Sequence, residues 1–326
     1  MTPELQNGQS LGRVLIGSRS FGQVFPEHIR QLEQVGCEVI PNGVGRAYRA
    51  HELKSALVDV DAIITGTDEL TAEIINGADK LRTIAKHGIG IETIDMEAAR
   101  ARGIVVSATP QASSDSVADL TLALLLAAAR KVVPAHLNTV SGGWKAYTGM
   151  ELRDKVLGII GLGRIGQQVC RRALGFGMQA IAYDPYANQE FVKANQVKLV
   201  SLAELLASAD VVTLHVPADQ VQCPLLDAAE LAQMKPGALL LNTARGALVD
   251  ENALADALRS GHLGGAGIDA FENEPPVGSP LLELENVVLT PHIGGRTYDG
   301  LRRMGEQTIE NVVRALRGDP PLFQIQ

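Results

Sequence analysis

Residues 156–166 have the sequence Val-Leu-Gly-Ile-Ile-Gly-Leu-Gly-Arg-Ile-Gly, an apolar run that leads directly into the pattern G-x-G-x-x-G. The apolar run predicts a buried strand, and residues 167–174 predict a helix. In such a turn Gly161 permits the tight bend, Gly163 lets the backbone approach a pyrophosphate, and Gly166 lets the helix pack on the strand. The stretch therefore predicts a dinucleotide-binding turn. The alternative is a plain glycine-rich turn.

Asp184 lies at the end of the next apolar run, residues 181–183, where a dinucleotide-binding domain places an acidic residue. A carboxylate there accepts hydrogen bonds from a free ribose 2′-hydroxyl and repels a 2′-phosphate. No Arg or Lys follows within the next few residues. We therefore expect NAD rather than NADP as the cofactor, the alternative being a solvated Asp at an Asp-Pro turn.

The length of 326 residues predicts two domains, because it exceeds the usual size of one. Apolar residues make up 46% of the chain and aromatic residues only 4%, a balance that suits parallel sheets covered by helices. The net charge of −8 argues against a nucleic-acid partner and against an anionic membrane surface. An anionic substrate would have to be held by a few concentrated basic groups and backbone amides.

Three cysteines, Cys37, Cys170 and Cys223, lie far apart and show no Cys-x-x-Cys spacing, so we expect neither a disulfide framework nor a metal site. The segment 1–10 has no basic start and no apolar core, which argues against a secretory signal. The most apolar run, residues 120–129, is too short to span a bilayer. These features predict a cytoplasmic protein.

Short apolar runs alternate with amphipathic stretches along the chain, as in the βαβα pattern of parallel sheets. The expected strands cover residues 14–17, 38–40, 62–65, 83–86 and 104–107 in the first series, and residues 156–160, 179–183, 211–214, 239–242, 265–268 and 287–289 in the second. The expected helices include residues 27–35, 51–58, 71–76, 96–102, 113–130 and 301–316. We predict an α/β protein of two doubly wound parallel-sheet domains, Rossmann-like or flavodoxin-like, with the active site in the cleft. One domain takes residues 1–108 with 296–326 and binds the substrate, and the other takes residues 109–295 and binds the nucleotide.

Three ionisable residues, Arg245, Glu274 and His292, follow three predicted strands of the second series. Ligands of open α/β sheets bind outside the carboxyl ends of strands, so these side chains can converge beside a nicotinamide. A 2-oxo acid needs a cation for its carboxylate and ketone and a proton donor titrating near neutrality, whose pKa a neighbouring carboxylate raises. Taken singly, each has an alternative: a helix cap or a partner of Asp250, an exposed loop carboxylate, and a hydrogen-bonded loop histidine.

The chain resembles the D-isomer-specific 2-hydroxyacid dehydrogenases along nearly all of its length, most of all their phosphoglycerate-dehydrogenase-like branch. The resemblance rests on residues 161–166, on Asn-Thr-Ala-Arg-Gly at 242–246, on Glu274-Pro275 and on Pro-His-Ile-Gly-Gly at 291–295. It implies an NAD-dependent enzyme that interconverts a small D-2-hydroxy acid and its 2-oxo acid, for example 3-phosphoglycerate, or hydroxypyruvate and glyoxylate. It further implies that His292 is the acid and base, Glu274 its partner and Arg245 the substrate-binding cation.

The resemblance also implies binding roles. Residues Lys86, His87, Ile89 and Gly90 belong to a glycine loop, in which the N–H groups of Ile89 and Gly90 hold the substrate carboxylate. Cofactor contacts are implied for Arg164 and Ile165 at the pyrophosphate, His215 and Pro217 beside the adenosine, and Thr243 and Asp269 at the nicotinamide end, with Asp269 as the carboxamide partner. The same resemblance implies a homodimer that uses the helix after Ser113 and the segment 132–147, which contains Trp144.

Two departures and one open position qualify this picture. Glu92-Thr93 stands where the family often has Asp-Asn, so the support beneath the glycine loop differs. The formate-oxidising relatives carry a Gln at the position of Glu274, so formate is disfavoured as a substrate. No serine-feedback module is expected after residue 326. Arg19 follows the first predicted strand, and with Arg46 and Lys86 it could bind a second anionic group of the substrate; the alternative is a set of solvated loop charges.

Two other functions stay open. A nucleotide-sensing interaction protein, resembling the corepressors that share this fold, would keep the same Arg, Glu and His. A dehydrogenase of the wider fold acting on another alcohol is the second alternative, although the expected anion loop disfavours it.

Overall fold

The computed structural model describes residues 10–218 and 221–325 of the chain. The chain forms two compact units, unit 1 from Met1–Ser113 with Arg296–Gln326, and unit 2 from Ser114–Gly295. The segment 1–9, on which most of the argument against a secretory signal rests, lies outside the described residues.

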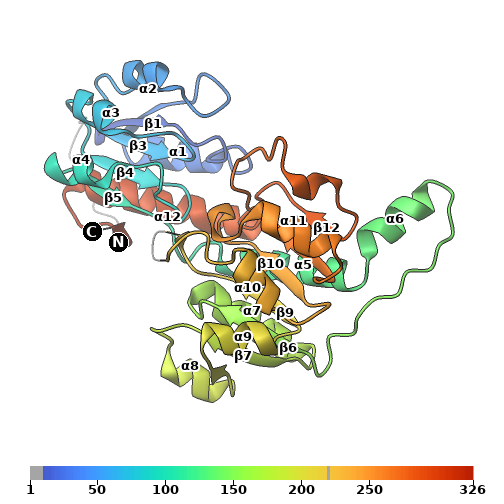
Figure 1. Ribbon diagram of the computed structural model, residues 1–326. Helices are drawn as coiled ribbons and strands as arrows, with labels where there is room; N and C mark the ends of the chain where they lie inside the picture. The colour runs from blue at the N-terminus through green and yellow to red at the C-terminus, as the bar shows by residue number, and fades with distance from the viewer. Residues whose placement is uncertain (1–9, 219–220, 326) are drawn as a thin grey trace. The chain divides into compact units, whose positions relative to one another are not determined.

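Unit 1 is built on a sheet whose described strands run in the order β13-β5-β4-β3-β1-β2 (Figure 1). Strands β1 (Gly12–Ile16), β2 (Cys37–Ile40), β3 (Ala62–Thr65), β4 (Thr83–Lys86) and β5 (Val105–Ser107) are parallel, and β13 (Gln324–Ile325) pairs antiparallel to β5. The order of the parallel strands is that of flavodoxin-like folds, in which ligands bind where the strand order reverses, between β1 and β3.

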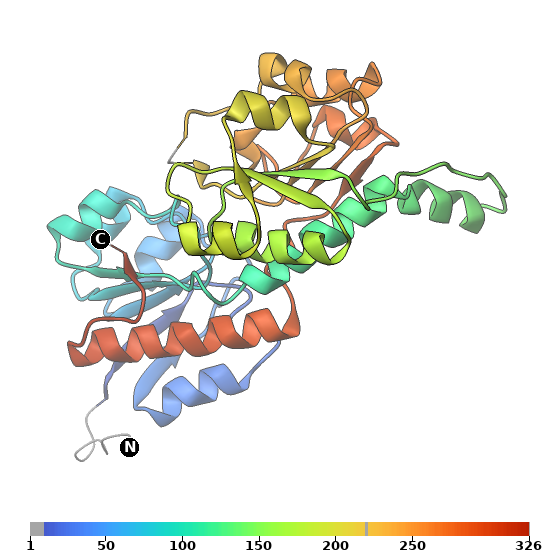
Figure 2. The same cartoon turned by 90° about the horizontal axis from the view of Figure 1, so that it is seen from below.

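Helices cover both faces of this sheet because side chains alternate along each strand. Val14 and Ile16 of β1 pack with α1 (Glu27–Gln34) and α12 (Tyr298–Arg317), which lie side by side in Figure 2. Leu15 belongs to the opposite core, under α2 (Ala50–Ala56), α3 (Ala72–Gly77) and α4 (Met96–Ala101). Unit 1 is therefore a three-layer α/β/α unit whose last layer is completed by the C-terminal helix.

Unit 2 has a parallel sheet with the described order β12-β11-β10-β9-β6-β7-β8, the order of dinucleotide-binding folds with one strand added. Its strands are β6 (Val156–Ile160), β7 (Gln179–Tyr183), β8 (Lys198–Leu199), β9 (Val211–Leu214), β10 (Leu239–Asn242), β11 (Gly265–Ile268) and β12 (Val287–Leu289). The strand order reverses between β6 and β9, so the turn 161–166 and the segment after Leu214 lie at the same crevice.

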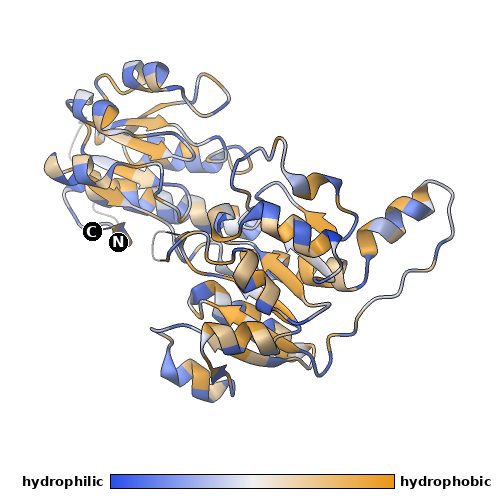
Figure 3. Ribbon diagram, viewed as in Figure 1, coloured by the Kyte–Doolittle hydropathy of each residue, from blue (hydrophilic) through white to orange (hydrophobic). Residues whose placement is uncertain are grey.

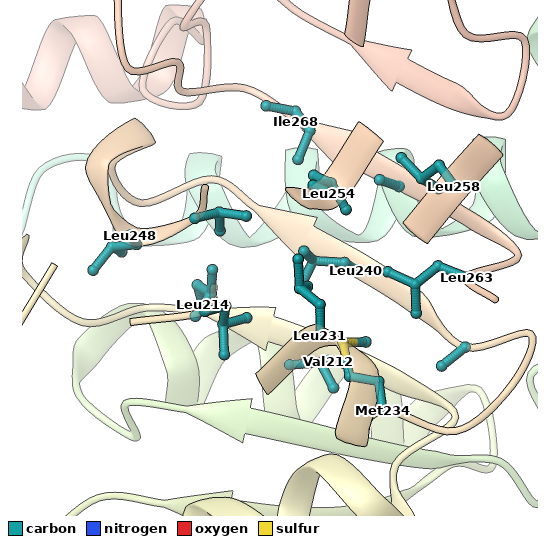
Figure 4. Close-up of a cluster of buried hydrophobic side chains, with 14 of the residues drawn as sticks. Val212, Leu214, Leu231, Met234, Leu240, Leu248, Leu254, Leu258, Leu263 and Ile268 are labelled. Carbon is teal, nitrogen blue, oxygen red and sulfur yellow. The ribbon is translucent and has the colours of Figure 1, made fainter. Parts of the chain in front are cut away.

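The helices of unit 2 enclose two cores. Helices α5 (Ser114–Ala129), α7 (Arg164–Gly175) and α8 (Gln189–Ala194) cover one face, and α9 (Leu202–Ser208), α10 (Ala228–Gln233) and α11 (Glu251–Arg259) cover the other. Figure 4 shows part of the second core, where Val212, Leu214 and Leu240 of the sheet meet Leu231 and Leu254 of the helices. The central strands are mostly apolar (Figure 3), because both faces of the sheet are covered. The described part of unit 2 also contains the short 3₁₀ helices Gly246–Leu248 and Pro280–Glu283.

Helix α6 (Val132–Val140) is the exception to this packing, since none of its residues is buried. It extends away from the body of unit 2 with the loop that follows it (Figures 1 and 2). Leu137, Val140 and Trp144 are 61%, 72% and 94% exposed. An apolar arm of this kind indicates a contact surface.

The predicted α/β class is confirmed, and eight of the predicted strands have the observed bounds. The boundary between the units differs from the prediction, because residues 109–113 belong to unit 1 rather than to the other domain. The Thr109 N–H and hydroxyl donate to the Gly88 carbonyl, and Arg303 donates to the Ala112 carbonyl, so this segment is tied to unit 1. The second boundary between the units lies between residues 295 and 296.

Candidate active site

The glycine turn after β6 has the geometry of a nucleotide cradle, for a different reason at each glycine. Gly161 has a φ of +92°, and a Cβ there would lie 2.7 Å from the His215 carbonyl oxygen. A Cβ at Gly166 would lie 2.1 Å from the Gly161 oxygen, so α7 could not pack on the turn. Gly163, the N-cap of α7, is exposed and faces open space. The turn thus leaves room where a pyrophosphate would approach the helix N-terminus, and it fits a dinucleotide.

Asp184 follows β7 and is half-buried beside this turn. Its carboxylate accepts hydrogen bonds from the N–H of Leu162 and from the N–H of Tyr186, both at 2.7 Å. The first contact ties the end of β7 to the glycine turn, and the second forms an Asx turn before the exposed Tyr186. The structure shows Asp184 as a turn residue, and its role as a ribose acceptor stays a prediction that these two contacts permit, because each carboxylate oxygen can accept more than one hydrogen bond.

The remaining cofactor candidates lie around the same crevice. Arg164 is exposed and Ile165 half-buried in the first turn of α7, and Pro217 is exposed after β9. The His215 imidazole Nε2 lies 2.9 Å from the Thr213 hydroxyl, and burial lowers the pKa of His215 to about 3. His215 is therefore neutral at physiological pH, which suits a contact with an uncharged group.

Thr243 is buried, and its hydroxyl lies 2.9 Å from that of Thr121 in α5. Because the Thr121 hydroxyl donates to the Val117 carbonyl, Thr243 is the donor to Thr121. The contact joins the end of β10 to α5.

Arg245 is presented by a turn that Asn242 shapes at the end of β10. The Asn242 amide donates to the Arg245 carbonyl at 2.8 Å and accepts the N–H of Ala244 at 3.0 Å. The next residue, Gly246, packs so closely on the chain after β11 that a Cβ there would lie 1.8 Å from the Phe271 carbonyl carbon. The segments that carry Arg245 and Glu274 are therefore brought together by a contact that only glycine permits.

His292 and Glu274 form a direct pair. The imidazole Nδ1 lies 2.8 Å from both carboxylate oxygens, and the Phe271 N–H also donates to Glu274. The hydrogen bond to Glu274 raises the pKa of His292 above its usual value, against the opposing effect of burial. Burial acts to raise the pKa of Glu274, but the bond to His292 and the charges of His292 and Arg245 outweigh it, so this pKa is lowered.

Arg245 also acts on the pKa of His292, which its positive charge lowers. All three predicted residues belong to unit 2, and the charge of Arg245 acts on the pKa of both Glu274 and His292. This arrangement combines a proton donor, its orienting carboxylate and a guanidinium, which is what reduction of a ketone next to a carboxylate requires.

Asp269 has a role that the sequence analysis missed. It is 1% exposed, and its carboxylate accepts hydrogen bonds from the Thr290 hydroxyl at 2.6 Å and from the N–H groups of Ile293 and Gly294 at 2.8 Å. These bonds hold both sides of the turn in which His292 has a left-handed φ of +51°. Asp269 thereby positions His292, and the only signal in the sequence was an Asp immediately after an apolar strand.

The predicted glycine loop of unit 1 begins at the end of β4. Gly88 has a φ of +150°, and the structure shows no hydrogen-bond acceptor among the described residues for the N–H groups of Ile89 and Gly90. Ile89 is 37% exposed. Two adjacent amides that lack an internal partner form a site that favours an anion.

The two side chains that begin this segment are engaged within unit 1. The Lys86 ammonium donates to the Gly66 carbonyl. His87 is 7% exposed, its Nδ1 lies 3.2 Å from the Thr308 hydroxyl, and burial lowers its pKa to about 3. His87 is therefore uncharged at neutral pH, and its side chain packs between the sheet and α12. Its predicted contact with a substrate stays a prediction.

Arg46, one of the cations suggested for a second anionic group, is paired internally. Its guanidinium makes a two-pronged contact with the Glu52 carboxylate, with both N–O distances at 2.7 Å. Arg19 is exposed after β1 and lines a cavity of unit 1. Arg19 therefore lies where a ligand could reach it, and its binding of an anion stays a prediction. Arg46, by contrast, already pairs with Glu52 of α2.

Comparison with known proteins identifies the family and the fold. Residues 122–294 match the model of the D-isomer specific 2-hydroxyacid dehydrogenase NAD-binding domain. The chain belongs to the D-isomer-specific 2-hydroxyacid dehydrogenase family. The nucleotide-binding unit predicted from the glycine turn is therefore the NAD-binding domain of this family.

Three similar proteins illustrate the range within the family. D-3-phosphoglycerate dehydrogenase of Methanocaldococcus jannaschii is 42% identical over 89% of this chain and 56% of its own length. Glyoxylate reductase of Thermococcus litoralis is 41% identical over 81% of this chain and 82% of its own length. The crystal structure of a protein from Thermus thermophilus has 40% identity and a TM-score of 0.88, covering 96% of this chain and all of that one. The chain thus spans about half the length of the phosphoglycerate dehydrogenases that it matches.

Three further observations concern the described residues alone. None of their helices is both long and apolar enough to cross a bilayer. They contain no group of three or more His, Cys, Asp or Glu side chains arranged to hold a metal ion. Cys37, Cys170 and Cys223 are free thiols, the first two buried and the third exposed.

Proposed function

We propose that this protein is an NAD-dependent dehydrogenase that interconverts a small D-2-hydroxy acid and its 2-oxo acid. The observation that supports this proposal best is the His292–Glu274 pair, with a raised pKa at His292 and the charge of Arg245 acting on both groups. Candidate substrates are 3-phosphohydroxypyruvate, hydroxypyruvate and glyoxylate with their hydroxy acids.

In the direction of reduction, His292 holds the proton that the substrate oxygen receives. Since Nδ1 faces Glu274, the proton leaves from Nε2, and Glu274 stabilises the imidazolium before transfer. NADH, which the glycine turn 161–166 would hold, would supply the hydride for the carbonyl carbon. Arg245 stabilises the charge that develops on the oxygen and contacts the substrate carboxylate. In the oxidative direction, neutral His292 takes the hydroxyl proton.

The other residues bind and orient. We assign the substrate carboxylate to the amides of Ile89 and Gly90, which lack an internal acceptor among the described residues. Unit 1 is then the substrate-binding domain and unit 2 the nucleotide-binding domain. For Asp269, contact with the nicotinamide carboxamide requires an accessible carboxylate, so its burial favours the positioning of His292 instead.

NAD is the proposed cofactor rather than NADP, because Asp184 would repel a 2′-phosphate. Arg164 and Ile165 would lie at the pyrophosphate. Neutral His215 and exposed Pro217 flank the adenosine side, and Thr243 lies toward the nicotinamide.

The proposal is tested by following NADH oxidation with glyoxylate, hydroxypyruvate, 3-phosphohydroxypyruvate and pyruvate, each at several concentrations. Steady turnover with at least one of these acids is expected. Tight NADH binding without turnover of any acid would contradict a dehydrogenase and support the nucleotide-sensing alternative.

We also propose a homodimer that uses α6 and the loop containing Trp144. The support is the exposure of Leu137, Val140 and Trp144 on an arm with no buried residue, because such surfaces are stable in water when a second chain covers them. Sedimentation analysis should show a dimer for the native protein and a monomer for Leu137→Asp. Leu282→Asp, which places the same charge on an exposed leucine elsewhere in unit 2, is the control and should remain dimeric.

A cytoplasmic location is proposed because the described cysteines form no disulfide and Cys223 is an exposed free thiol, which a reducing compartment preserves. Cell fractionation that places the protein in an oxidising compartment would contradict this proposal.

A further inference from the structure

Unit 1 contains a cavity of about 480 Å³ at the carboxyl ends of β1 and β2. Its volume lies within the range of small-molecule sites, roughly 300–1,000 Å³. Ser18, Arg19, Asn42 and Arg296 contribute the polar part of the lining, and Phe21 and Ile29 contribute part of the apolar side. Of the described residues that line it, none carries a carboxylate.

The cavity lies where the fold itself favours a ligand. The strand order of unit 1 reverses between β1 and β3, and crevices at such points are the usual ligand sites of open α/β sheets. Ser18 follows β1, and Gly66 follows β3 so closely that a Cβ on Gly66 would lie 3.1 Å from the Ser18 Cα. The crevice between the ends of β1 and β3, where the strand order reverses, therefore lies directly beside Arg19.

Two arginines of the cavity are available for a ligand. Within the described part of the chain, neither Arg19 nor Arg296 has an ion pair or a hydrogen bond from its side chain. Both side chains are exposed. Arg46, which lies one residue after the lining residue Gly45, is by contrast held by Glu52, so its charge is neutralised. In a chain of net charge −8, two such cations at one cavity without a facing carboxylate create a local preference for anions.

The wall of the cavity is held rigidly by Asn42. Its amide donates to the Gly17 carbonyl at 2.7 Å and to the Arg46 carbonyl at 3.0 Å, while its oxygen accepts the N–H groups of Val44 and Gly45. The loops after β1 and β2 are thereby fixed to each other. A site preorganised in this way loses little entropy when it binds a ligand.

We propose that this cavity binds a second anionic group, a phosphate or a carboxylate, at the end of the substrate remote from its 2-oxo acid group. The inference rests on the proposed function, since it places the 1-carboxylate at the amides of Ile89 and Gly90. In the sheet β4 is separated from β1 by β3, which amounts to two strand spacings or about 10 Å. A three- or four-carbon acid charged at both ends, together with the reach of an arginine side chain, spans that distance.

Phe21 links the two binding regions within unit 1. It lines the cavity, and its ring meets the imidazole of His87 edge-on, with the ring centroids 5.4 Å apart. His87 lies directly before Gly88 of the glycine loop. The cavity and the loop are therefore joined by packed, buried side chains rather than by solvent.

Two matched substrate pairs test the proposal, namely 3-phosphohydroxypyruvate against hydroxypyruvate, and oxaloacetate against pyruvate. The members of each pair differ by one anionic group, a phosphate in the first and a carboxylate in the second. We expect the more anionic member of at least one pair to have at least a tenfold higher kcat/KM, and the pair that shows the effect identifies the group. Arg19→Ala and Arg296→Ala should each reduce this preference about 10- to 100-fold, mainly through KM, as expected for lost charge-assisted hydrogen bonds.

Arg30→Ala is the matched control. Arg30 is exposed on α1, next to the lining residue Ile29, but does not line the cavity, so its removal changes the net charge equally and should leave the preference intact. Arg19→Lys should retain part of the preference, because lysine keeps the charge but loses the forked geometry.

The outcomes separate the two proposals. Turnover of hydroxypyruvate and pyruvate with no preference in either pair would overturn the second-anion site while leaving the dehydrogenase function intact. If no acid is reduced at all, the proposed function fails, and calorimetric titration with 3-phosphoglycerate and with malate decides about the cavity. Binding of either that weakens at least tenfold in Arg19→Ala but not in Arg30→Ala supports an anion site. Absent or equal binding in these proteins overturns it.

Discussion

The imidazole Nδ1 of His292 lies 2.8 Å from each carboxylate oxygen of Glu274. One nitrogen of the ring is thus committed to the carboxylate, which fixes the ring orientation and leaves Nε2 for the proton that the reaction moves. The pair makes the protonation state of His292 depend on the neighbouring carboxylate.

The pH dependence of reduction should follow this pair. Since the pKa of His292 is raised by Glu274, the acid form persists toward higher pH, and kcat/KM for reduction should fall as pH rises through that raised pKa. Glu274→Gln removes the raising charge while burial of His292, which lowers its pKa, remains. The alkaline limb of the kcat/KM profile should therefore move to lower pH in this variant.

Glu272→Gln provides the comparison, because it makes the same change of charge at an exposed residue two positions away. Its profile should match that of the native protein. Identical alkaline limbs in the native protein and in Glu274→Gln would show that Glu274 does not set the pKa of the catalytic acid.

Replacement of His292 should lower turnover. Asn is the informative substitution, because it tolerates the left-handed φ of +51° better than Ala and cannot act as an acid at neutral pH. We expect kcat to fall by roughly 10²- to 10⁴-fold, the usual contribution of a general acid. The dissociation constant for NADH, measured by fluorescence titration, should change little, and near-normal turnover would refute the role.

Cofactor preference should depend on the charge of Asp184. Asp184→Asn keeps an acceptor oxygen for the turn but removes the charge that would repel a 2′-phosphate. The ratio of kcat/KM with NADH to that with NADPH should fall about tenfold or more, the value of one charged hydrogen bond. Equal use of both cofactors by the native protein would contradict this argument.

Substitutions at two glycines of the nucleotide turn should have different effects, one mainly on stability and the other mainly on NADH binding. Gly166→Ala forces a Cβ toward the Gly161 oxygen, so it should destabilise unit 2 by about 1–3 kcal/mol and lower Tm by about 2–4 °C per kcal/mol. Gly163→Ala points into open space with a φ of −74°, so Tm should change less while NADH affinity falls roughly tenfold or more. Calorimetry and NADH titration on both variants measure the two effects, and the reverse pattern would contradict the assignment.

Apolar runs bounded by glycine and charged residues made most of the fold predictable, because strands that are covered on both faces appear in the sequence as continuous apolar runs. Two strands escaped prediction. The two residues of β8 are exposed, and β13 forms only by pairing antiparallel with β5, more than two hundred residues earlier in the chain. Neither has a burial pattern of its own, so no local periodicity could reveal it.

In the candidate site, too, some features could be predicted from the sequence and others could not. The convergence of Arg245, Glu274 and His292 could be predicted, since each follows a strand of one parallel sheet. The commitment of Arg46 to Glu52 and the anchoring of the His292 turn by Asp269 could not, because both depend on distances that the chain establishes only when folded. Arg296 was missed for a related reason, since its contribution to a cavity near β1 joins the two ends of the chain.

Helix α12 has a consequence for the order in which the chain acquires structure during synthesis. Unit 2 is continuous from Ser114 to Gly295, whereas one face of the unit 1 sheet is covered in part by Ile309, Val312 and Leu316. A ribosome therefore synthesises all of unit 2 before it adds the residues that close unit 1. Until α12 is made, Val14 and Ile16 lack part of the apolar layer that buries them. The core of unit 1 therefore stays incompletely packed until about the last thirty residues are added.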